Sequence, residues 1–100
     1  SEKERKKIKY STIDQRLFAA YLKFEVLDKP GVLSNITSVF SKNKVSIERL
    51  VQNPDKGKKF STIIIITYNT KNKYLKRIIN EITKKNFIKK KPKLIRIDNN

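Results

Sequence analysis

The residues whose types and spacing could do chemistry lie in one stretch, residues 28–33, with the sequence Asp-Lys-Pro-Gly-Val-Leu. Pro30 suits the first turn of a helix, where its missing N–H is not needed, and Gly31 lets another group approach the backbone. Free N–H groups at a helix start attract a carboxylate, while Asp28 could receive an ammonium group. The stretch therefore indicates an amino-acid site, and the structural alternative is that Asp28 only caps the helix.

The composition excludes several other kinds of chemistry. The 100 residues contain no Cys, His, Met or Trp, which excludes disulfides, Cys/His metal sites, a Ser-His triad and a thiol nucleophile. Two glycines cannot build a dinucleotide-binding turn or a phosphate loop. Glu25 and Asp28 would face opposite sides of a strand, which argues against a general acid–base pair. We therefore expect no catalytic residue, metal or cofactor in this chain.

Charge and hydropathy bear on partner and location. The net charge is +16, from a chain with 20 Lys, 5 Arg, 14 Ile and 9 Asn. Lys, Ile and Asn have AT-rich codons, and arginine, the preferred residue for bidentate phosphate contacts, is scarce. We expect non-specific attraction to polyanions at low salt but no specific nucleic acid partner. No apolar run fits a membrane span or a signal peptide, which predicts a cytoplasmic protein.

The hydrophobic pattern predicts the elements that position the stretch. Residues 1–17 are interpreted as a charged linker or tail, and residues 18–98 as one domain. Its predicted elements are a strand at 18–27, a helix at 30–43, strands at 45–52 and 59–67, a helix with its apolar stripe at Leu75, Ile78, Ile79 and Ile82, and an extended segment at 94–97. Asn69 and Thr70 are candidate N-caps of the second helix.

This order predicts an α+β fold, a ferredoxin-like βαββαβ sandwich in which a four-stranded antiparallel sheet carries both helices on one face. The strand at 59–67 is apolar on both sides, since Ile64 and Ile66 point one way while Ile63 and Ile65 point the other. We therefore expect the second sheet face to be covered by another copy of the domain or by another part of a longer chain.

Two families share this topology. An RNA-recognition motif needs exposed aromatic residues on the central strands, and the run at 59–66 has only Phe60, so Tyr21 or Phe24 would have to serve. The turn at 28–33 instead resembles the D-x-P-G-x-L turn of the ACT domain family, and residues 45–48 resemble the family's entry into its second strand. The segments 21–33, 46–52, 63–67 and 95–98 are further similar to the C-terminal domain of the homoserine dehydrogenase family.

The resemblance implies a regulatory role. Homoserine dehydrogenases reduce aspartate semialdehyde to homoserine with NAD(P)H on the path to threonine and methionine, and their catalytic domains, with the NAD(P) cofactor, are not in this chain. An ACT domain there implies a homodimer or higher oligomer that senses an amino acid, usually threonine, bound between the first turn of one copy and a strand of its neighbour. The alternatives are a dimerisation module without a ligand and an RNA-binding domain.

The residues that carry over as ligand-binding are few. At the turn they are Asp28, Gly31, Val32 and Leu33, and on the second strand they are Ser46, Ile47 and Gln52. We interpret the apolar ones, Val32, Leu33 and Ile47, as core residues that would reach a ligand only through their backbone. Gln52 is the strongest polar candidate on the strand, because an amide can both donate and accept a hydrogen bond.

Overall fold

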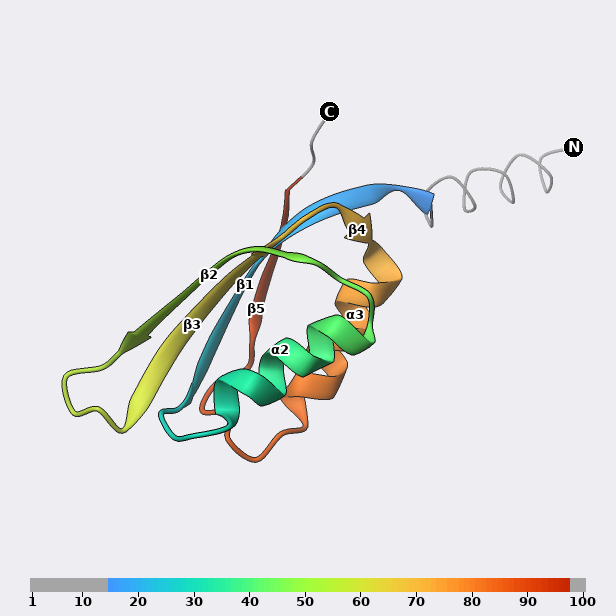
Figure 1. Cartoon of the computed structure of the whole chain (residues 1–100). Helices are drawn as coiled ribbons and strands as arrows, with labels where there is room; N and C mark the ends of the chain where they lie inside the picture. The colour runs from blue at the N-terminus through green and yellow to red at the C-terminus, as the bar shows by residue number, and fades with distance from the viewer. Residues whose placement is uncertain (1–14, 98–100) are drawn as a thin grey trace, which may run out of the picture.

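The strands and helices follow one another along the chain in the predicted order, with one additional short strand, β4, before the second helix (Figure 1). The computed structural model describes residues 15–97, so most of the predicted tail, residues 1–14, lies outside the described residues, as does Asp98. The elements are β1 (Leu17–Leu27), α2 (Val32–Lys42), β2 (Ile47–Pro54), β3 (Phe60–Thr67), β4 (Thr70–Lys71), α3 (Asn72–Thr83) and β5 (Lys93–Ile97).

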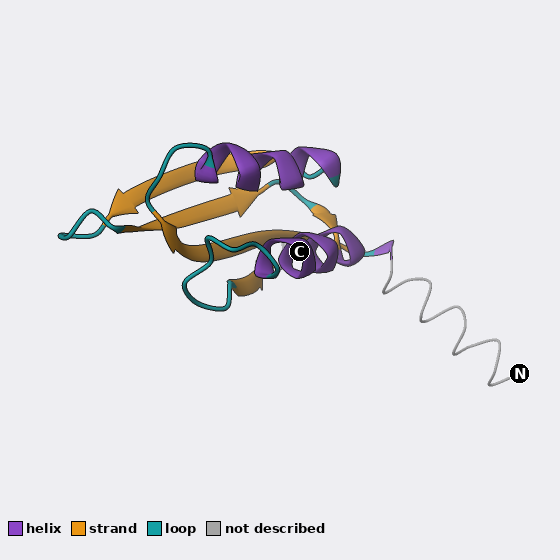
Figure 2. Ribbon diagram, turned by 90° about the horizontal axis from the view of Figure 1, so that it is seen from below, coloured by secondary structure: helices purple, strands orange, loops and turns teal. Residues whose placement is uncertain are grey.

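All strand pairs in the sheet are antiparallel, and β1 lies at its centre. On one side β1 pairs with β3, from Tyr21 opposite Ile66 to Leu27 opposite Phe60, and β2 lies beyond β3. On the other side β1 pairs with β5. Both helices cover the same face of the sheet (Figures 1 and 2). The predicted ferredoxin-like sandwich is confirmed.

The core lies between the helices and one face of the sheet, where the sequence pattern placed it. Its fully buried side chains come from both central strands and both helices: Leu22, Phe24, Val26, Ile36, Phe40, Ile63, Ile65, Leu75, Ile78 and Ile82. The rings of Phe24 and Phe40 meet edge to face, with their centroids 6.2 Å apart, and so join β1 to α2. The alternation in β1 and the helical stripes therefore fix which sides of these elements face inward.

The opposite sheet face carries apolar side chains, and no element within residues 15–97 covers it. Tyr21, Ile64 and Ile66 are half-buried on this open face. Val51, Ile95 and Ile97 on the outer strands are 40%, 48% and 39% exposed. Phe24, by contrast, is completely buried and cannot stack on an RNA base, so of the two aromatic residues that the RNA-binding alternative named, only Tyr21 lies on the open face.

The structure departs from the prediction mainly at element ends. The two-residue strand β4 was missed; its Thr70 lies opposite Phe18, and Lys71 occupies the N-cap of α3 where Asn69 or Thr70 was expected. A strand of two residues is too short for any periodicity. β2 begins at Ile47, two residues later than predicted, with an irregularity before Arg49.

Candidate functional site

The turn between β1 and α2 is held by backbone hydrogen bonds on both sides. The N–H of Asp28 donates to the carbonyl of Lys59 over 2.9 Å, which ties the turn to the start of β3. The N–H of Asn35 donates to the carbonyl of Gly31 over 2.9 Å and closes the first turn of α2. Gly31 itself has φ 90° and ψ −18°, a left-handed conformation that glycine adopts at little cost. The turn thus presents the start of α2 in a defined orientation.

The predicted placement of Pro30 and the structural alternative for Asp28 are both wrong. Pro30 lies before the helix rather than in its first turn, because Gly31 is the N-cap and α2 begins at Val32. Asp28 does not cap the helix, since no side chain makes a capping hydrogen bond at the N-terminus of α2. The left-handed Gly31 redirects the chain after Pro30, so the Asp28 carboxylate is exposed rather than aimed at the first helical N–H groups. The purely structural interpretation of Asp28 as a cap is therefore excluded.

The structure brings Gln52 toward the same end of the sheet as the turn. Gln52 is exposed on β2 opposite Ile63, and its amide Nε2 donates to Oγ of the buried Ser61 over 3.2 Å. Ser61 lies opposite Val26, two residues before Asp28. One N–H of the Gln52 amide is thus engaged with Ser61 of β3. The carbonyl oxygen of the same amide remains for a ligand or water.

Ser46 and Ile47 lie at the opposite end of the domain. They follow the C-terminus of α2, and a helix of 11 residues is about 16 Å long. Ser46 is exposed and Ile47 is half-buried, and both line a groove of about 470 Å³ beside the last turn of α2. Within one copy, therefore, the predicted site residues form two groups rather than one.

The two apolar residues at the turn are packing residues. Val32 is only 4% exposed and belongs to the core, and Leu33 is half-buried against it. Their side chains therefore position the start of α2, as interpreted from the sequence, and only their backbone groups face the turn.

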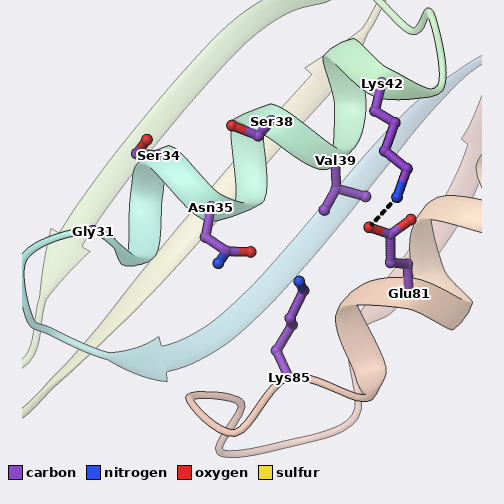
Figure 3. Close-up of a pocket in the computed structure, with 8 residues that line it drawn as sticks. All are labelled: Gly31, Ser34, Asn35, Ser38, Val39, Lys42, Glu81 and Lys85. Carbon is purple, nitrogen blue, oxygen red and sulfur yellow. Dashed lines mark hydrogen bonds and ion pairs between the residues drawn. The ribbon is translucent and has the colours of Figure 1, made fainter.

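A polar groove between the two helices adds residues that the sequence interpretation did not single out (Figure 3). Its volume is about 380 Å³, and it is lined by Gly31, Ser34, Asn35, Ser38, Val39, Lys42, Glu81 and Lys85. Nζ of Lys42 donates to Oε2 of Glu81 over 3.1 Å and bridges the groove at one end. Asn35, Ser38 and Lys42 follow Gly31 at helical spacing and form a polar stripe on α2. This stripe is the feature of the sequence that could have revealed the groove.

Within residues 15–97 no group of three or more acidic side chains is arranged to hold a metal ion. The Glu25 carboxylate lies on the open sheet face, where it accepts a hydrogen bond from Oγ1 of Thr62. None of the helices in this part of the chain is long and apolar enough to cross a bilayer.

A family model of the ACT domain matches residues 20–86, which include the turn, both helices, most of β1 and all of β2, β3 and β4. The chain belongs to the ACT domain family. The ACT domain from the GTP pyrophosphokinase of Chlorobium tepidum has the same fold, with a TM-score of 0.65 at 20% identity, covering 79% of this chain and 99% of that one.

This ACT domain is most informatively compared with homoserine dehydrogenases. The enzyme of Neisseria gonorrhoeae is 29% identical over 86 residues, which are 86% of this chain and 20% of the enzyme. The crystal structure of a homoserine dehydrogenase from Thiobacillus denitrificans superimposes with a TM-score of 0.74 at 28% identity, covering 87% of this chain and 19% of that one. The ACT domain therefore spans about a fifth of the length of these relatives and resembles one part of them.

Proposed function

We propose that this ACT domain binds a small amino acid, threonine in the first place, and regulates a longer cytoplasmic protein similar to the homoserine dehydrogenases. The observation that supports this most strongly is the turn. The exposed carboxylate of Asp28 lies four residues before Val32, where α2 begins without a side-chain cap, and left-handed Gly31 lies between the two. An α-amino acid carries the complementary groups, an ammonium for Asp28 and a carboxylate for the N–H groups of α2.

The proposed site is completed by a second copy. Asp28 and Gln52 lie at one end of the sheet and Ser46 and Ile47 at the other, too far apart to hold one small molecule within a single chain. In a twofold interface, residue i of one copy contacts residue j of the other, and j contacts i. We therefore propose an arrangement in which the turn of each copy lies against the start of β2 of the other. The ligand would then lie between copies.

Regulation follows by linkage. An amino acid that contacts two copies binds their associated state better than the separated state, and so shifts the equilibrium toward association by its differential affinity. In a longer protein, that shift would change the activity of the attached domains. For a protein similar to the relatives, that activity would be an NAD(P)-dependent reduction.

Isothermal titration of the chain with threonine, serine and isoleucine tests the proposal. We expect saturable heat with threonine, a weaker response with the others, and a loss of about 10–100-fold in affinity for Asp28→Ala, since a hydrogen bond to a charged group contributes about 1.5–3 kcal/mol. Asp55→Ala is the matched control, because Asp55 is an exposed aspartate in the neighbouring hairpin. Equal binding by the two variants would refute the role of Asp28, and no heat at millimolar threonine would refute amino-acid binding.

A dimerisation module without a ligand is the second candidate, and the open sheet face favours it. Its apolar side chains include Val51, Ile95 and Ile97, which are 39–48% exposed. Light scattering distinguishes this candidate: Ile95→Glu should dissociate a dimer built on this face, while Tyr68→Glu, an exposed aromatic outside the strands, should not. A monomer at all concentrations would contradict it.

A further inference from the structure

Lysines are concentrated on three loops. These are the turn at residues 28–31, the hairpin at 55–59 and the connection between α3 and β5 at 84–92. Their 18 residues include nine lysines and two aspartates, a net charge of +7. The other 65 described residues hold 11 lysines and arginines and three glutamates, a net charge of +8. Because lysine is disfavoured in the core, it accumulates in exposed segments, and half of the residues in these three loops are lysines.

The three loops lie at one end of the molecule. The N–H of Asp28 donates to the carbonyl of Lys59, which joins the turn to the hairpin. The N–H of Leu27 donates to the carbonyl of Phe87, and the N–H of Lys89 donates to the carbonyl of Glu25, which holds the third loop along β1. Figure 1 shows all three loops at the lower end of the sheet, and Figure 2 views the chain from that side. We call these loops the lysine end.

The charges of the lysine end are not neutralised within residues 15–97. None of its nine lysines forms an ion pair there, and the pair between Lys42 and Glu81 lies in the groove between the helices. Lys56, Lys90 and Lys91 are exposed. Neighbouring cations that hold no counter-charge create a positive potential that attracts a polyanion.

We propose that the lysine end binds the phosphate backbone of a nucleic acid, without reading its bases. Lysine makes point-charge contacts with phosphates, whereas the commonest specific contact to a base in a groove is made by arginine, which these loops lack. The large apolar side chains that are exposed, Leu17, Val51, Tyr68, Ile95 and Ile97, all lie outside the three loops. An acidic membrane is the less suitable partner, since stable attachment to a bilayer needs an apolar or lipid anchor beside the basic residues.

The location distinguishes this proposal from the RNA-recognition motif. In that motif bases stack on aromatic residues of the open sheet face. Here the contacts are made by loops at the end of the sheet. Phe87, the aromatic residue within these loops, is only 5% exposed, and the ring of Phe60 is already flanked by Lys59 and Lys89, whose Nζ atoms lie 5.6 and 4.2 Å from its centroid.

Fluorescence anisotropy with a labelled 20-nucleotide oligothymidylate at 25–200 mM NaCl tests the proposal on the full chain. Each phosphate neutralised on a single strand contributes about −0.7 to the slope of log K against log salt. We expect a slope of about −3 or steeper. The variant K56Q/K90Q/K91Q should flatten the slope by about 2 and weaken binding at 100 mM NaCl at least about 10-fold.

The matched control is K44Q/K73Q/K76Q, which removes the same charge from exposed positions near the opposite end of the domain. It should change the slope by less than about 0.5. Equal effects of the two triple variants would show attraction by net charge alone and overturn the proposal, as would absence of binding at 50 mM NaCl.

A second experiment measures binding to vesicles rich in phosphatidylserine. Binding to them as tight as to the oligonucleotide, and equally dependent on Lys56, Lys90 and Lys91, would assign the lysine end to a membrane and overturn the proposal. Thermal melts confirm that each variant is folded.

Discussion

Replacing Gly31 by alanine isolates the energetic cost of the left-handed turn. A Cβ atom at this position would have no neighbour within 4 Å, so Gly31→Ala introduces no steric clash. What remains is the backbone, which has φ 90° and therefore lies in a region that side-chain-bearing residues avoid. That strain costs about 1–2 kcal/mol.

Gly57 supplies the control within the same chain. Its φ is not positive, and a Cβ there would make an ordinary contact, 3.7 Å from Oδ1 of Asp55. Gly57→Ala should therefore be neutral or stabilise by up to about 1 kcal/mol, because alanine restricts the unfolded chain. The two substitutions are chemically identical and differ only in backbone conformation.

Thermal unfolding followed by circular dichroism measures the difference. In a domain of this size about 1 kcal/mol shifts Tm by roughly 4–8 °C, so Gly31→Ala should lower Tm by about 5–15 °C while Gly57→Ala leaves it nearly unchanged. Gly31→Asn should recover part of the loss, since asparagine tolerates left-handed backbone. If Gly31→Ala melted together with Gly57→Ala, the turn would not have the left-handed geometry on which the proposed amino-acid site depends.

Two further substitutions test the packing and the groove. Oγ1 of the buried Thr67 accepts a hydrogen bond from the N–H of Ala20 over 3.0 Å, so Thr67→Val should destabilise by about 1–3 kcal/mol in urea unfolding, because it leaves a buried donor unpaired. Thr67→Ser, which keeps the hydroxyl, should lose clearly less, and equal losses would contradict this role of the hydroxyl. The ion pair between Lys42 and Glu81 is largely exposed, with side chains 69% and 31% accessible, so Glu81→Gln should change the stability by less than about 1 kcal/mol. A larger loss would mean that the pair holds the two helices together.

The core and topology were predictable because they depend on short-range periodicity. Leu22, Phe24 and Val26 alternate along one strand, and Ile36 and Phe40 recur at helical spacing, so the sequence alone indicates which sides face inward. Once these faces are known, the order of the elements leaves one common way to stack two helices on a sheet.

The site was only partly predictable because it depends on local backbone conformation and on faces that are not apolar. The sequence indicates a turn at Asp28, yet only the left-handed conformation of Gly31 shows that the carboxylate is not a cap. The stripe containing Asn35 and Ser38 is indistinguishable in sequence from a solvated helix surface, and it becomes a groove only because α3 lies beside it. Similarly, the lysines of three separate loops gather at one end only after the strands have paired.

The placement of Ser46 at the far end of α2 from Asp28 also shows what sequence spacing leaves open. The two residues are 18 positions apart, and the family resemblance implies that they contribute to one site formed between two copies. An intervening helix of 11 residues separates them, so a common site requires two copies.

Titrating the isotope-labelled chain with threonine and following its amide resonances by NMR tests the central claim most directly. If the amino acid binds between two copies, saturable shifts should appear in two separate groups, one at Asp28–Leu33 and one at Ser46–Ile47, with a single dissociation constant for both. Serine should shift the same resonances more weakly. Resonances that do not move at millimolar threonine, or that move at only one end of α2, would contradict a shared amino-acid site.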